Sequence, residues 1–176
     1  MEDQIQSQLM NITAHAARYC SMVEHAPEFG KKEFISEALQ LLPAIYMDFS
    51  DPELNFGETD EYLSTYVDEA YYNQVKQQIA SLMGEYDVYL ETFEEDMKYS
   101  DTPVAASISE SLADIFQALY NFTSNVRESE GTDVIAAYQE CRENFEGYWS
   151  QTLCNVMRAL NNLKYNSNLE EETEDE

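Results

Sequence analysis

The chain is poor in basic residues, glycine and proline, and each shortage excludes a class of protein. Nine lysines and arginines stand against 35 aspartates and glutamates, which gives a net charge of -26 at pH 7. A surface this acidic repels phosphate backbones and anionic lipids, so direct nucleic-acid binding and membrane docking are not expected. Five glycines and four prolines are too few for an all-β domain rich in tight turns.

Cysteines and long apolar runs are also scarce. The three cysteines form no C-x-x-C pair, and Cys141 and Cys154 fall about 20 Å apart if they share one helix, beyond disulfide reach. Reduced thiols are typical of the cytoplasm. The start, MEDQIQ, lacks the features of a signal peptide, and the longest apolar run, LLPAIYM, is too short to cross a bilayer. We therefore predict a cytoplasmic protein.

The residues that are present predict a folded helical domain. The hydrophobic fraction is 44%, with 13 tyrosines and 8 phenylalanines, which is enough to build a core in 176 residues. Apolar residues recur at steps of three and four, the period of an α-helix. This spacing predicts helices over residues 3–25, 31–49, 68–83, about 103–127 and 133–165.

The segments between and within these helices are less regular. Pro43 lies inside the second predicted helix, where a proline produces a kink or a break. Residues 50–66 are predicted to be a connector, and residues 85–99 to be a short helix or an irregular loop. The segment SDTPVAAS predicts a helix start with Pro103 in the first turn.

The fold class that follows is all-α. We predict a single-domain antiparallel bundle of about five main helices over residues 1–166. Residues 167–176 carry six acids in the last seven positions and are predicted to form a disordered acidic tail that buries nothing. Deleting the tail after Ser167 should therefore leave the melting temperature unchanged or slightly higher.

The stretch SISESLADIFQALYNF contains the first candidate site residues. On a helical wheel its apolar residues form one stripe, whereas Glu110 and Asp114 lie outside that stripe. A solvated face is the simplest interpretation of these two acids. We also expect Asp114 to reach the edge of a facing helix and to couple partially with Arg142.

The last predicted helix contributes the other candidates. Arg142 lies at the edge of an aromatic stripe, four residues before Glu146, which predicts an ion pair at the border of the core. Trp149 is predicted to be a core residue. The residues predicted to face inward are Tyr138, Cys141, Phe145, Tyr148, Trp149, Val156, Leu160 and Leu163.

Motifs for metals, cofactors and catalysis are not found in the sequence. Neither His15 nor His25 completes the Glu-x-x-His pair of a di-metal bundle. The acidic segment EYDVYLETFEED lacks the ligand pattern of a calcium loop, and there is neither a glycine-rich phosphate loop nor G-x-S-x-G. We predict no metal, no cofactor and no catalytic residue.

Two segments resemble a known family. ISESLADIFQALYNF and ECRENFEGYWSQTLCNVMRAL are similar to the motifs of the bacterial family called domain of unknown function 5063, and LLPAIY and LMGEYDVYLETF resemble its earlier segments. The chain departs from these motifs at Phe116 and Ser150, where the family favours tyrosine and glycine. The resemblance implies an α-helical domain with no assigned activity. If the motifs mark a site, the matching positions are Glu110, Asp114, Glu146 and Trp149.

Three functions remain open at this point. The sequence favours a helical interaction or accessory protein with a strongly acidic surface and a basic protein partner. Its oligomeric state is unknown from the sequence. One alternative is an enzyme in which Glu110, Asp114 and Glu146 converge with Arg142 in a groove between helices. The other is an acidic phosphate mimic that occupies the basic groove of a nucleic-acid-binding protein.

Overall fold

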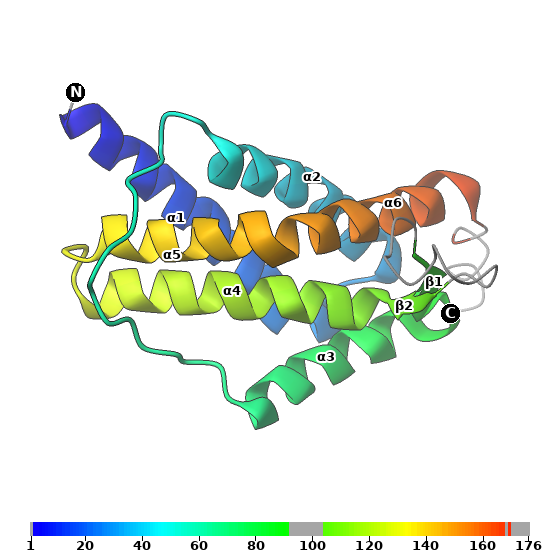
Figure 1. Cartoon of the computed structure of the whole chain (residues 1–176). Coiled ribbons are helices and arrows are strands. Elements are labelled where there is room, and N and C mark those ends of the chain that lie inside the picture. The colour runs from blue at the N-terminus through cyan, green and yellow to red at the C-terminus, as the bar shows by residue number, and fades with distance from the viewer. Residues whose placement is uncertain (1, 92–103, 168, 170–176) are drawn as a thin grey trace.

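The computed structural model describes residues 2–91, 104–167 and 169, and within them the chain is mainly helical (Figure 1). The predicted all-α fold is confirmed. The helices are α1 (Glu2–Glu24), α2 (Lys31–Ser50), α3 (Glu69–Met83), α4 (Ile108–Glu128), α5 (Val134–Asn144) and α6 (Ser150–Asn166). Short elements complete the described fold: 3-10 turns Ala26–Glu28 and Gly84–Asp87, strands β1 (Val88–Leu90) and β2 (Ala105–Ser107), and a π-helical turn Phe145–Trp149.

Helix α4 is the centre of the bundle. It packs against α1, α3, α5 and α6, and α2 packs against α6 and α1. Its predicted apolar stripe is confirmed, because all five members are buried: Ile108, Leu112, Ile115, Leu119 and Phe122. Figure 1 shows α4 and the α5–α6 rod side by side and running in opposite directions, joined by a short turn.

Helices α1 and α2 behave largely as their spacing predicts. The phenol of Tyr19 is buried in the core and donates to the carbonyl oxygen of Leu112 over 2.7 Å, which ties α1 to α4. Helix α2 is continuous through Pro43, so of the two predicted outcomes, a kink or a break, the break does not occur. At the start of α3, Asp68 accepts a hydrogen bond from the amide of Tyr71 as the predicted cap. Gly84 ends this helix with φ 57°, as predicted.

Helix α4 begins later than predicted, at Ile108. The hydroxyl of Ser107 accepts from the amide of Glu110, and the carboxylate of Asp87 accepts from the amide of Ser109. These two caps satisfy orphan amides of the first turn. The residues just before α4 form strand β2, which pairs antiparallel with β1. Pro103 lies outside the described residues.

The segment 85–99 is likewise only partly described. Its first residues form the 3-10 turn Gly84–Asp87 and strand β1, and residues 92–103 lie outside the described residues. The described part is therefore a 3-10 turn followed by a strand, whereas the sequence predicted a short helix or an irregular loop.

The last predicted helix is one rod with an extra residue in its middle. At the π turn the amide of Ser150 donates to the carbonyl of Phe145, an i to i+5 bond that holds one more residue than an α turn. This turn corrects one prediction, because Tyr148 is 62% exposed whereas its neighbour Trp149 is buried. The apolar stripe shifts by one position at the turn.

The tail is described at only one position past Ser167. Leu169 is buried at 5% exposure and joins the hydrophobic core, so the expectation that the tail buries nothing is wrong for this residue. Residues 168 and 170–176, on which the prediction of disorder falls, lie outside the described residues.

Candidate functional site

Arg142, in the last turn of α5, and Glu146, in the π turn, form the predicted ion pair. The Nε of Arg142 lies 2.9 Å from the Oε1 of Glu146. The side chain of Arg142 is 8% exposed, whereas that of Glu146 is 54% exposed, so the pair spans the border of the core. The Nη1 of Arg142 donates to the backbone carbonyl of Asp51, just after α2. The guanidinium therefore has structural partners on two segments.

Trp149 is a core residue, as predicted. It is 1% exposed and makes edge-to-face contacts with Phe49 and Phe145, at ring-centroid distances of 5.3 and 4.7 Å. Its indole Nε1 has no hydrogen-bond partner among the described residues. The aromatic body, rather than the polar edge, accounts for its position.

Asp114 and Glu110 lie elsewhere, on the side of α4 that faces α3. The carboxylate of Asp114 accepts from the phenol of Tyr72 over 2.5 Å and from that of Tyr148 over 3.1 Å. Burial, followed by the bond to Asp114, raises the pKa of Tyr72. Glu110 is exposed and lies 3.8 Å from the Nζ of Lys76.

The five candidates are therefore divided between two places. Among the described residues, no hydrogen bond or ion pair joins Asp114 to Arg142, so the expected partial coupling of these two side chains has no contact to carry it. The physical reason is that tyrosines from α3 and from the π turn satisfy Asp114, while Glu146 and the chain after α2 satisfy Arg142.

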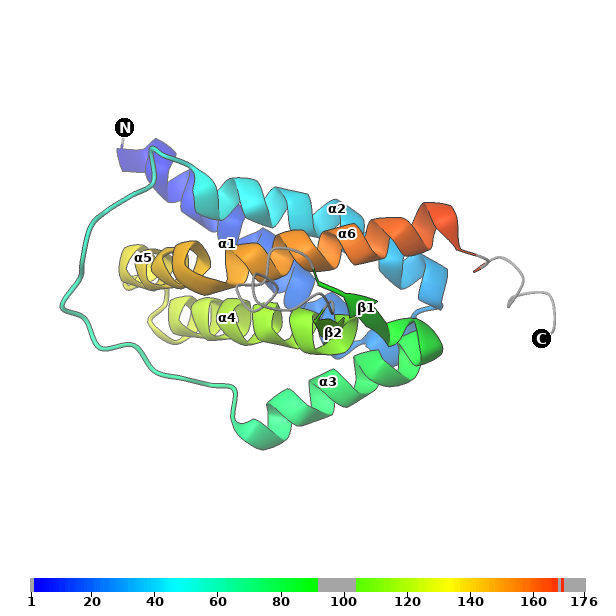
Figure 2. The same cartoon turned by 45° about the vertical axis from the view of Figure 1, so that its right-hand side comes forward.

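The connector, residues 51–68, is held along the bundle by polar side chains of α4 and α5. Gln139 of α5 accepts from the amide of Phe56 over 2.9 Å. Asn125 of α4 accepts from the amide of Ser64 and donates to its carbonyl. Asn121 accepts from the amides of Tyr66 and Val67. Figure 2 shows this segment running from the end of α2 to the start of α3, past the end where α4 and α5 are joined.

The held connector and α5 enclose an acidic cleft. Its cavity of about 280 Å³ is lined by Glu58, Thr59, Asp60, Glu61, Leu63, Gln139, Glu140 and Glu143. Neither lysine nor arginine occurs among these lining residues. Burial and the charge of Glu143 raise the pKa of Glu140, and a hydrogen bond with Asp133 raises the pKa of Glu61. Like charges are therefore held close together here.

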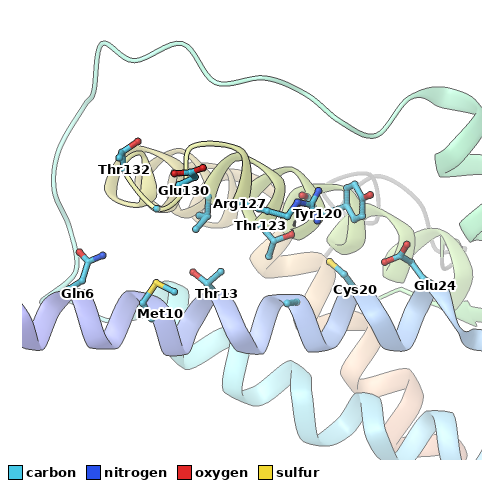
Figure 3. A pocket seen from close by; sticks show the side chains of 13 residues that line it. Gln6, Met10, Thr13, Cys20, Glu24, Tyr120, Thr123, Arg127, Glu130 and Thr132 are labelled. Carbon is cyan, nitrogen blue, oxygen red and sulfur yellow. Dashed lines mark hydrogen bonds between the residues drawn. The ribbon is translucent and has the colours of Figure 1, made fainter.

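A second hollow, which we call the α1–α4 groove, has a volume of about 650 Å³. Figure 3 shows Met10, Thr13 and Cys20 projecting from α1 toward Thr123 and Arg127 of α4. The full lining is Gln6, Met10, Thr13, Ala17, Cys20, Glu24, Tyr120, Thr123, Val126, Arg127, Glu130, Gly131 and Thr132.

Thiols and metal ligands add no reactive centre in the part of the chain that the structure describes. Cys20 and Cys141 are buried and Cys154 is exposed, and none of them forms a disulfide. Burial raises the pKa of the Cys20 and Cys141 thiols. No cluster of three or more histidine, cysteine, aspartate or glutamate side chains is placed to hold a metal ion within the described ranges.

The sequence did not predict which polar side chains hold the connector, namely Asn121, Asn125 and Gln139. It also did not predict the acids that line the cleft. A signal was available for the two asparagines, which lie four residues apart on one side of α4, beside the apolar stripe. Asn125 and Gln139 are 8% and 4% exposed, and polar residues this deeply buried are expected to have partners.

These features define a helical-bundle protein with a net charge of -26. No helix in its described part is long and apolar enough to cross a membrane. The chain belongs to the family described as domain of unknown function (DUF5063), whose model matches residues 3–166. A crystal structure of protein BF1032 from Bacteroides fragilis is similar, with 29% identity and a TM-score of 0.77. The match covers 90% of this chain and 93% of that chain. No curated protein matches.

Proposed function

We propose that this protein is a cytoplasmic, non-enzymatic interaction protein whose partner presents a basic surface. The observation that carries the proposal is the acidic cleft, in which Glu58, Asp60 and Glu61 are held against Glu140 and Glu143. Mutual repulsion would separate these carboxylates if the connector were free. The buried contacts from α4 and α5 oppose that repulsion and keep the charges together.

The distribution of the positive charges supports the same proposal. The described lysines and arginines interact within their own chain: Arg18, Lys76, Arg127 and Arg142 with carboxylates, Lys31, Arg158 and Lys164 with tyrosine rings, and Lys32 with a further neighbour. The excess of 35 acids over nine bases therefore leaves most carboxylates for solvent ions or a partner. Such a surface steers a basic partner and makes its association salt-dependent.

The contacts of the earlier candidates favour interaction over catalysis. Arg142 and Asp114 are both occupied by structural hydrogen bonds. Trp149 is enclosed in the core at 1% exposure, where it is out of reach of a substrate. These side chains therefore support the bundle that presents the acidic surface.

A short oligolysine peptide provides the test. We expect it to bind at low salt and to dissociate once the Debye length falls well below about 10 Å. The variant Glu140→Gln with Glu143→Gln should weaken binding more than the control Glu28→Gln with Glu33→Gln, which changes the net charge equally near the start of α2. Equal weakening by the two variants would place the contact outside the cleft. Failure to bind at low salt would refute the proposed function.

A further inference from the structure

The α1–α4 groove continues the surface on which α3 packs. Tyr71 in the first turn of α3 donates to Glu24 of α1, and its ring lies 5.6 Å from that of Tyr120 on α4. Glu24 and Tyr120 also line the groove, so the open part begins where α3 starts. Both α1 and α4 extend beyond this point, whereas α3 has only 15 residues and leaves the remainder uncovered (Figures 1 and 3).

The lining of the groove fits an apolar helix face better than a polar small molecule. Met10 is 48% exposed there, and Ala17 and Val126 add small apolar surface. The hydroxyl of Thr13 donates to the carbonyl of Leu9, and that of Thr123 to the carbonyl of Tyr120. These hydroxyls already have partners, so the apolar contacts contribute most of the available binding energy.

The charged residues at the groove indicate which charge an occupant would carry. Glu24 lies at one end and Glu130 at the other. Arg127 is 3.5 Å from Glu128, which compensates its charge. Cationic flanks on an occupant would therefore complement these two carboxylates and the net charge of the chain.

The left-handed conformation of Glu130 belongs to the C-terminal cap of α4, in which the amide of Gly131 donates to the carbonyl of Val126 and that of Glu130 to the carbonyl of Arg127. The φ of Glu130, 54°, lies in the left-handed region, which costs an L-residue energy and favours glycine. The conformation places a glutamate at the end of the groove. The cap therefore fixes the backbone of Glu130 at that end of the groove.

We propose that the α1–α4 groove binds an amphipathic α-helix of a partner protein, about three turns long, with an apolar face and basic flanks. The length follows from the span between Tyr120 and Glu130, about 15 Å at 1.5 Å per residue. The helix lies end to end with α3 between α1 and α4. This inference rests on the proposed function, because it names the kind of basic partner, but it uses a different part of the surface from the acidic cleft.

The test uses the full chain and a labelled synthetic peptide with leucines at helical spacing and lysines on its flanks. Fluorescence anisotropy measures binding, and circular dichroism measures the helix that the peptide gains. We expect Met10→Asp and Ala17→Gln to weaken binding by about tenfold or more. The control Met47→Asp alters a methionine that is 73% exposed on α2 and should leave binding unchanged. Both groove positions are largely exposed, so the variants should fold, which circular dichroism of the proteins verifies.

Several results would overturn the inference. Binding that is insensitive to Met10→Asp, or equal binding of a scrambled peptide, would show that the groove is not used. Equal binding of a peptide with glutamates in place of the lysines would refute the basic flanks. A dimer of the protein that Met10→Asp abolishes would assign the groove to a second copy instead. Oligolysine separates the two proposals: if it binds and the amphipathic peptide binds no better, only the groove inference fails, and if neither binds, the proposed function fails.

Discussion

Arg142 holds the backbone carbonyl of Asp51, 91 residues earlier in the chain, and so fixes the first residue of the connector to α5. The same guanidinium pairs with Glu146, and it is almost completely buried. A charged donor with two partners at the border of the core is expected to contribute strongly to stability. The first prediction concerns this contact.

Arg142→Gln should lower the free energy of unfolding by about 2–3 kcal/mol, because a buried charged group loses its hydrogen bonds. Urea denaturation measures the change. Arg127→Gln is the matched control, since its ion pair with Glu128 is exposed on both sides and should contribute within about 0.5 kcal/mol. Equal losses in the two variants would show that the contact with Asp51 does not contribute to stability.

Asp114 should couple to tyrosine and not to Arg142. The double mutant Asp114→Asn with Arg142→Gln is expected to be additive within about 0.3–0.5 kcal/mol, because the two side chains share no partner. Asp114→Asn with Tyr72→Phe should couple by more than that, because the 2.5 Å hydrogen bond joins them. The free energies of unfolding of the single and double mutants measure both cycles. Coupling to Arg142 would contradict the contacts described above.

Leu169 should stabilise the bundle although it follows the last helix. Leu169→Ala removes a side chain that is only 5% exposed and is expected to cost about 2 kcal/mol. A chain that ends at Leu169 should unfold within about 0.5 kcal/mol of the full chain, since the residues removed are mainly acids that repel one another. Thermal and urea unfolding compare the three proteins. A neutral Leu169→Ala would refute the burial.

Glu130→Gly should stabilise the protein. At φ 54° a glycine adopts the backbone conformation without the steric cost of a Cβ, and the expected gain is about 1 kcal/mol. Glu128→Gly makes the same chemical change in the last turn of α4 and should cost about 0.5–1 kcal/mol. The opposite signs make the pair a strict test by chemical denaturation. A loss for both would show that the strain at Glu130 is not relieved by glycine.

The acidic cleft should make stability depend on pH. Burial and Glu143 raise the pKa of Glu140 above its ordinary value of 4.5, so the folded protein binds this proton more readily than the unfolded chain. Ionised Glu140 therefore destabilises the fold at neutral pH, and the fold gains stability as the pH falls through the raised pKa. Glu140→Gln should raise the melting temperature at pH 7, and the gain should shrink toward pH 4.5. Glu53→Gln, an exposed change outside the cleft, is the control. A gain that is constant with pH would contradict the assignment.

The parts of the fold that local sequence determines were predictable. The stripe of α4 follows from the helical period, and the Arg142–Glu146 pair follows from a spacing of four. Trp149 was predicted to be buried because its large apolar ring belongs to the aromatic stripe of the last helix, and it is 1% exposed. Each of these features depends on residues within a few turns of one another.

The parts that were missed depend on long-range contacts or on competing local signals. Asn125 and Ser64 are 61 residues apart, and their spacing carries no period that a sequence could display. The acidic cleft depends on that placement of the connector. The helix start predicted near Pro103 was wrong because the caps from Ser107 and Asp87 fix the first turn at Ile108. Among the candidate site residues, the sequence therefore predicted chemical types and burial better than partners.

The π turn makes the length of the last rod adjustable by one residue. Buried positions follow steps of four and three up to Phe145, then two successive steps of four carry the stripe through Trp149 to Leu153. The π turn accommodates one more residue than an α turn, so both halves of the rod keep their apolar faces toward the core. A relative that lacks one residue within the turn would keep the same core with an uninterrupted α-helix, and it would lose the outward turn that places Tyr148 against Asp114. Gaps in an alignment of this family can therefore fall inside a helix without marking a change of fold.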